Sequence, residues 1–228
     1  MASRPIFISK RDFPFVEEKQ VEFTWHPGFS ILQKQKSIAD LHRSFQMLVP
    51  TSNTLEVSSK SDKELGVALS AFNLKVSLNK GDSVAVENLF QASKIFENGG
   101  PYKDLLYISP LDAKRDNRLK ESGKVIGFKG KEQVWPTEPK TLYYDWIYIN
   151  ALHSNKNLRE SVQKFDSFSD IEFNPMKSFN CQARSVALYV SLSKINKIEK
   201  VISSPDYYRE LMIPKITTQN IFSQQSLF

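Results

Sequence analysis

The first fifty residues change from the polar–apolar period of a strand to that of a helix. Residues 21–25 alternate strictly between apolar and polar positions, which predicts a β-strand with one buried face. Over residues 31–48 the apolar positions recur on one side of a helix. Ser30 is a favourable N-cap and Pro50 cannot continue a helix, so we expect one helix between them.

The middle of the chain combines short apolar runs with turn residues. Three such runs predict strands, at 55–57, 65–69 and 74–78. A turn is expected at 79–82, and an amphipathic pattern then predicts a helix over 83–96. The sequence Asn-Gly-Gly-Pro at 98–101 marks a stop, because glycine adopts a left-handed C-cap and proline cannot extend a helix.

The second half is expected to be mainly helical. Residues 121–140 are rich in glycine and proline and predict a large loop. The segment 141–152 is apolar almost all round and Asp145 is its only charged residue, which predicts a buried helix. Ser178 or Asn180 is the expected N-cap of a last core helix. Further helices are expected as a pair around Ser109-Pro110, over 103–120, and at 156–164. Together the elements predict an α+β fold that is mainly helical, with short strands.

Composition narrows the function classes. The 228 residues carry 31 Lys and Arg against 25 Asp and Glu, a net charge of +6 that permits an anionic partner without requiring one. The single cysteine excludes an internal disulfide, and no Cys/His cluster suggests a zinc site. No secretory signal and no apolar stretch of membrane-spanning length is present. We therefore expect a cytoplasmic protein without a membrane segment, a metal or a cofactor.

Glu87, Gln91 and Lys94 form a polar stripe on the helix expected at 83–96. Residues at i, i+4 and i+7 lie on one helical face. A carboxylate beside an amine suits acid–base chemistry, although the same stripe can be an ordinary solvated face. The glycines of segment 98–102 favour a site, because glycine lets backbone amides approach a phosphate closely.

Three further features have both a structural and a functional interpretation. Asp145 needs a partner if it is buried, either a structural cation or a site in which its pKa is perturbed. Trp135, next to Pro136, is either a core residue or a stacking surface for a base. Residues 112–131 carry seven Lys and Arg against three acids, which is either a solvated face or a track for a phosphate backbone.

Five segments resemble the NADAR family in order. The segment VENLFQASKIF at 86–96 resembles its helix motif V-E-x-x-F-Q-A-x-K-F, with Ile95 as a departure. The other four are LSAFN at 69–73, SPLDAKRDNR at 109–118, YDWIYINAL at 144–152 and NCQARSVAL at 180–188. Ala71 stands where the family has Asn, Asn117 where it has Gly, and the last segment lacks the family's glycines. The whole chain is similar to the NADAR antitoxins paired with DarT-type toxins that ADP-ribosylate guanine in DNA.

The resemblance implies an ADP-ribosylglycohydrolase that removes ADP-ribose from guanine bases of DNA and so acts as an antitoxin. The implied partners are ADP-ribosylated DNA, the ADP-ribose product and, functionally, the cognate toxin. The implied organisation is one NADAR domain over 1–228. Its core is expected at 55–195, with an N-terminal extension at 1–54 packed on it and a C-terminal tail at 204–228.

The resemblance also implies roles for particular residues. Lys94 is expected to form a Schiff base, which requires a free amine, and Lys114 is the second candidate. Glu87 is expected to be the acid/base, with Asp145 in the same pocket. The expected substrate-binding residues are Ser59, Lys60, Ser70, Asn73, Gln91, Asn98, Gly99, Gly100, Tyr102, Lys114, Arg115, Trp135 and Asn180.

Two other functions stay open at this point. One is a YbiA-like N-glycosidase for small phosphoribosyl-amine intermediates of riboflavin synthesis, for which the first 50 residues and the basic stretch at 112–131 are superfluous. The other is a module that binds ADP-ribose or ADP-ribosylated DNA without cleavage. The presence of both Glu87 and Lys94 argues against that module.

Overall fold

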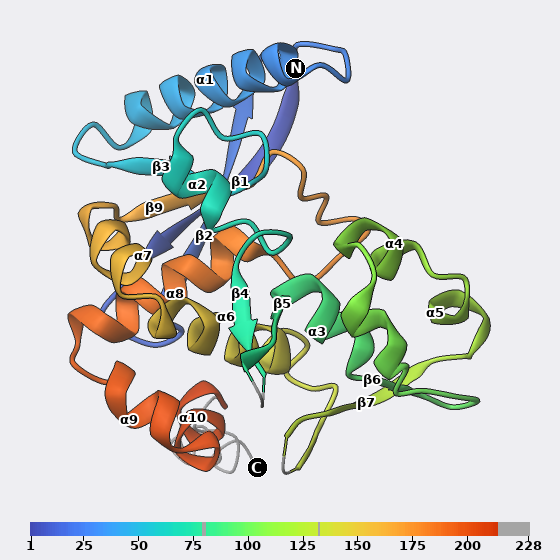
Figure 1. Cartoon of the computed structure of the whole chain (residues 1–228). Coiled ribbons are helices and arrows are strands. Elements are labelled where there is room, and N and C mark those ends of the chain that lie inside the picture. The colour runs from blue at the N-terminus through green and yellow to red at the C-terminus, as the bar shows by residue number, and fades with distance from the viewer. Residues whose placement is uncertain (79–80, 132, 214–228) are drawn as a thin grey trace, which may run out of the picture.

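A four-stranded sheet joins the N-terminal residues to the rest of the chain. β1 (Ala2–Ser9) and β2 (Val16–Phe23) form an antiparallel hairpin. The sheet order is β2-β1-β9-β3, in which β9 (Ser167–Ser169) runs antiparallel to β1 and parallel to β3 (Thr54–Glu56). The computed structural model, shown in Figure 1, describes residues 1–78, 81–131 and 133–213.

The two faces of this sheet are covered by different helices. Ile6 packs with apolar residues of α1 (Ile31–Leu48), whereas the next residue, Phe7, packs in the larger core with α6 (Leu142–Ser154) and α8 (Gln182–Lys194). Successive side chains of a strand point to opposite faces, so α1 lies on one face and the main core on the other (Figure 1). The predicted bounds of α1 are confirmed.

The region expected as one helix over 83–96 is divided into three elements. β5 (Ser83–Ala85) pairs with β4 (Lys75–Ser77), α3 covers only Val86–Ala92, and β6 (Lys94–Phe96) pairs with β7 (Val125–Lys129). The prediction is therefore wrong at both ends. Helical periodicity is a local signal, whereas the strand partners that recruit the two ends lie elsewhere in the chain.

Two other short segments also differ from expectation. The expected strand at 65–69 is the helix α2 (Glu64–Ala68), in which a Cβ on Gly66 would lie 2.0 Å from the Glu56 carbonyl oxygen. The expected loop at 121–140 contains β7 and β8 (Val134–Trp135), which complete the sheet β6-β7-β8. Short apolar runs do not distinguish strands from buried helices, so long-range packing decides between them.

The remaining helices surround this core. Of the helical pair expected around Ser109-Pro110, both helices are present and Ser109 caps the second by accepting from the Asp112 amide, but a third short helix begins at Arg118. Neither Ser178 nor Asn180 caps α8, because Cys181 occupies the N-cap without a side-chain hydrogen bond. The other helices are η2 (Lys103–Tyr107), α4 (Pro110–Arg115), α5 (Arg118–Glu121), α7 (Lys156–Ser161), η3 (Val162–Lys164), α9 (Ile198–Ser203) and α10 (Pro205–Met212).

The described residues form an α+β fold with several small sheets, as expected. Residues 79 and 80 of the expected turn, and 214–228 of the expected tail, lie outside the described residues. In the described ranges no helix is both long and apolar enough to cross a membrane.

Candidate functional site

Glu87 is held in the first turn of α3 by contacts with another segment. The amide of Val86 donates to the Leu74 carbonyl, and the amide of Glu87 donates to the Ala71 carbonyl, each at 3.0 Å. These bonds satisfy the start of a helix that has no side-chain N-cap. The Glu87 side chain is buried, and its Oε1 accepts a hydrogen bond from Gln91 Nε2 at 2.7 Å. Glu87 and Gln91 therefore face each other as the stripe predicts.

Lys94 lies on β6 and not on the helix, but its amine lies over a side chain of α3. Its Nζ lies 4.8 Å from the centroid of the Phe90 ring. Burial lowers the pKa of Lys94 to about 8; the Glu87 carboxylate opposes this shift, and the positive charge of Lys114 adds to it. An appreciable fraction of the side chain is therefore a free amine near neutral pH, as nucleophilic lysines require.

Lys114, on α4, places a second amine beside the same carboxylate. Its Nζ lies 3.9 Å from Glu87 Oε1 and 5.5 Å from the centroid of the Phe72 ring. The Lys114 side chain is 56% exposed, whereas that of Glu87 is 7% exposed. Lys114 therefore stands on the solvent side of Glu87, and Lys94 is the more buried of the two amines.

Buried polar atoms without a partner mark a region next to Glu87. Within the described residues, three of the side-chain atoms that lack a hydrogen bond are Ser70 Oγ, Gln91 Oε1 and Asn180 Oδ1. Their segments meet, because Gln182 Oε1 accepts from the Ala71 amide at 2.7 Å and Ala71 contacts Glu87. A buried polar atom left unpaired costs about 1–3 kcal/mol. These three atoms are therefore suited to hydrogen bonding with a polar ligand.

Asp170 is a buried carboxyl that the sequence analysis does not single out. It follows β9, its Oδ1 accepts from the Glu172 amide at 3.0 Å, and the Cys181 sulfur lies 3.9 Å from Oδ2. Burial, and next the neighbouring Glu56 carboxylate, raises the pKa of Asp170 to about 8, whereas Lys114 acts in the opposite direction. The available signal was an acid directly after a Ser-Phe-Ser strand, within the alternating segment SFSDIEF at 167–173.

Asp145 is paired within the core. It is 1% exposed, and it accepts hydrogen bonds from the Arg184 guanidinium and from Ser185 Oγ, the latter at 2.6 Å. The Asp145 carboxylate raises the pKa of Arg184. Both donors belong to α8, so Asp145 ties α6 to α8. This geometry favours the structural interpretation, and the role of Asp145 beside the ribose stays a prediction.

Close packing around residues 99 and 100 leaves no room for a side chain larger than that of glycine. A Cβ on Gly99 would lie 2.2 Å from the Tyr102 hydroxyl, and one on Gly100 would lie 2.5 Å from the Lys94 carbonyl oxygen. Gly100 also has φ +74°, which favours glycine, and the Phe96 amide donates to the Gly99 carbonyl at 2.9 Å. The pair therefore closes the turn that follows the strand of Lys94.

Trp135 is not available as a stacking surface, which corrects that expectation. It is 2% exposed and packs against aromatic rings of the core, because Tyr143, Trp146 and Tyr208 surround it. The apolar area of a tryptophan favours burial wherever the fold provides a cavity for it.

The other predicted binding residues lie at the surface or in local hydrogen bonds. Ser59 and Lys60 lie on the turn between β3 and α2. Asn73 donates to the Val67 carbonyl at 2.9 Å. Asn98 and Arg115 are exposed. Their part in binding stays a prediction.

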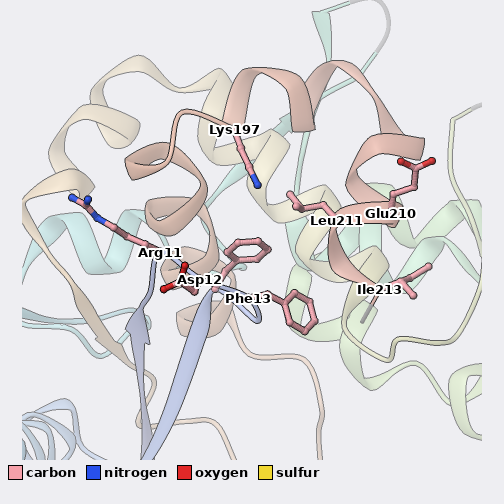
Figure 2. Close-up of a pocket in the computed structure, with 8 residues that line it drawn as sticks. Arg11, Asp12, Phe13, Lys197, Glu210, Leu211 and Ile213 are labelled. Carbon is pink, nitrogen blue, oxygen red and sulfur yellow. The ribbon is translucent and has the colours of Figure 1, made fainter. Parts of the chain in front are cut away.

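A separate cavity of about 380 Å³ lies between the β1–β2 turn and the α9–α10 region. Figure 2 shows Lys197 and Leu211 facing the turn that carries Phe13. Among the described residues its lining includes none of the candidates discussed above. Across residues 1–78, 81–131 and 133–213, no three His, Cys, Asp or Glu side chains are grouped to hold a metal ion.

The comparison with protein families agrees with the five resembling segments. A family described as the DarT1-associated NADAR antitoxin matches residues 2–221, which include β1, β2 and α1. No curated protein matches the chain. Membership implies removal of the ADP-ribosylation made by an associated DarT1 toxin. The chain thus belongs to the NADAR family, in the branch of DarT1-associated antitoxins.

Proposed function

We propose that this protein hydrolyses the bond between ADP-ribose and a guanine base of DNA, with Lys94 as a Schiff-base nucleophile and Glu87 as the acid/base. The observation that carries the proposal is the Lys94 amine over the Phe90 ring of α3, the helix of Glu87, with its pKa lowered to about 8 chiefly by burial. The mechanism needs an amine that is free near neutral pH beside a group that exchanges protons.

The chemistry follows from the linkage. Ribose C1″ is bonded to both the ring oxygen and the base nitrogen, so the ring opens to an imine as the proton of that N–H passes to the ring oxygen. The Lys94 amine adds to C1″, Glu87 carries its two protons in turn to the guanine nitrogen, guanine leaves with its free exocyclic amine, and a C1″–Nζ Schiff base forms. Water then adds to C1″, Nζ leaves, and the released aldehyde of ADP-ribose closes to its ring.

The surrounding groups suit the rest of the ligand. Ser70, Gln91 and Asn180 offer unpaired polar atoms for the ribose hydroxyls. Lys114, on the solvent side of Glu87, offers positive charge to the diphosphate. Asp170, with its pKa near 8, keeps a proton at neutral pH and is a second candidate acid.

The test uses a short single-stranded oligonucleotide that carries one ADP-ribosylated guanine. The protein is expected to release free ADP-ribose and unmodified oligonucleotide, separated by chromatography. Borohydride added during turnover is expected to reduce the Schiff base and add the mass of the sugar adduct to the peptide with Lys94. Lys94→Ala should abolish release and trapping. Lys129→Ala, on the neighbouring strand β7 and exposed, is the matched control.

The outcomes separate the activity from the mechanism. Absence of ADP-ribose release by the native protein contradicts the proposed activity. Full activity of Lys94→Ala, or an adduct on Lys114, leaves the activity in place and contradicts the assignment of the nucleophile.

A further inference from the structure

An exposed aromatic ring directly precedes a candidate site residue in the sequence. Phe179 is 62% exposed, and the Nζ of Lys140 lies 3.7 Å from the centroid of its ring. Lys140 is itself exposed. An exposed cation–aromatic contact contributes only about 0.5–1 kcal/mol to stability, so the fold has little need of this pair.

Both residues of the pair belong to segments that continue directly into the site. Phe179 precedes Asn180, whose Oδ1 is buried and unpaired within the described residues, and Cys181, whose sulfur lies near Asp170. Lys140 comes just before α6, whose Tyr144 packs edge-on against the Phe90 ring under Lys94. Each residue of the pair is therefore followed, within a few positions along the chain, by a residue near the proposed ribose pocket.

The segment 173–181, which carries Phe179, is fixed at both ends and by internal hydrogen bonds. It is anchored at one end by buried Phe173, which packs on Phe7, and at the other by buried Cys181. Between them, the amides of Lys177 and Ser178 donate to the Asn174 carbonyl at 2.9 and 3.1 Å. Figure 1 shows this segment running from the sheet toward α4, the helix of Lys114, and back to α8. The ring is therefore held outward instead of folding into the core.

We propose that Phe179 and Lys140 form a stacking platform for a nucleobase that flanks the modified guanine in single-stranded DNA. The inference rests on the proposed function and names its substrate more closely. An aromatic face with a cation beside it suits single strands, because any base can stack on the ring while the cation meets the adjacent phosphate. Exposed Lys177 on the same segment adds positive charge.

The platform replaces the aromatic surface expected from the sequence. Trp135 is buried, and Tyr102 is only partly exposed, with its hydroxyl hydrogen-bonded to Ser122 at 2.5 Å. Phe179, by contrast, is 62% exposed.

The first measurement is binding of a fluorescein-labelled, unmodified single-stranded oligonucleotide, followed by anisotropy. Phe179→Ala should weaken binding about 5- to 150-fold, the factor that corresponds to about 1–3 kcal/mol for one stacked base. Phe179→Tyr should restore it, because the ring face is kept. Lys140→Gln should weaken binding by a smaller factor that vanishes at high salt. Phe29→Ala is the matched control, since Phe29 is 98% exposed on the segment before α1.

The second measurement is cleavage. Phe179→Ala should raise KM for the modified oligonucleotide by a similar factor and leave cleavage of ADP-ribosylated guanosine unchanged. Native-like oligonucleotide binding by Phe179→Ala, or equal losses on oligonucleotide and nucleoside, overturns the platform while the hydrolase proposal stands. If the native protein cleaves neither substrate but its oligonucleotide binding depends on Phe179, the hydrolase proposal fails and the platform stands.

Discussion

The lowered pKa of Lys94 predicts how the rate depends on pH. Its fall from 10.5 to about 8, caused chiefly by burial, corresponds to about 3 kcal/mol against the ammonium form. At pH 7 about one side chain in ten is therefore a free amine, compared with about one in three thousand for an unperturbed lysine. Because the amine must be unprotonated to attack, the rate should rise with pH until the pKa is passed.

The assay is kcat/KM for ADP-ribosylated guanosine between pH 5.5 and 10, because this ratio reports the free enzyme. We expect about a tenfold rise per pH unit below about 8 and a plateau above it. Lys114→Gln removes a positive charge that lowers the pKa of Lys94, so the rising limb should move to higher pH. For an exposed charge worth about 0.2–1 kcal/mol, the limb moves up by as much as about 0.7 pH unit. The shift is measured relative to each variant's own plateau, because loss of the Lys114 charge toward the diphosphate also lowers the plateau.

Exposed Lys36 on α1 supplies the control, Lys36→Gln, which should keep the native profile. A rate that is constant between pH 6 and 8 would refute the requirement for a free Lys94 amine. A rate that still rises tenfold per unit beyond pH 9.5 would refute the lowered pKa. A Lys114→Gln profile displaced to lower pH would contradict the sign of the charge effect.

Three further predictions concern other parts of the molecule. Glu87→Gln keeps the shape but cannot exchange a proton, so kcat should fall about 10²–10⁴-fold in the oligonucleotide assay; a loss of a few-fold would reduce Glu87 to a binding role. Asp145→Asn leaves the partly buried Arg184 guanidinium without a charged partner and should lower the free energy of unfolding by about 3 kcal/mol in a denaturant titration. This is the lower end for a buried pair, because the Arg184 side chain is 22% exposed, and an unchanged midpoint would contradict the pairing. Arg115→Glu with Lys124→Glu should flatten the salt dependence of oligonucleotide binding by about 0.7 in log–log slope for each phosphate that the protein no longer neutralises, and an unchanged slope would mean a solvated face.

The sequence by itself determined the elements whose signals are local. Ser30 and the apolar face of 31–48 set the bounds of α1, because the N-cap and the helical period act within a few residues. The apolar segment 141–152 identified α6 as a buried helix. The order of motifs identified the family, and the resemblance made Glu87 and Lys94 the candidate catalytic residues. The i, i+4 spacing placed Glu87 opposite Gln91, since both lie inside α3.

The tertiary structure decided everything that depends on partners far apart in the chain. The helix expected over 83–96 ends at Ala92 because β7, some thirty residues on, pairs with β6. That break moves Lys94 off the helix, and its burial, not its position on a helical face, lowers its pKa.

The same reason governs the surroundings of three side chains in the core. Trp135 is buried by rings from α6 and α10, and Asp145 is paired by residues of α8. Asp170 has a raised pKa because the fold removes it from water and brings Glu56 beside it. Desolvation and charge proximity depend on three-dimensional distance, which residue spacing along the chain does not specify.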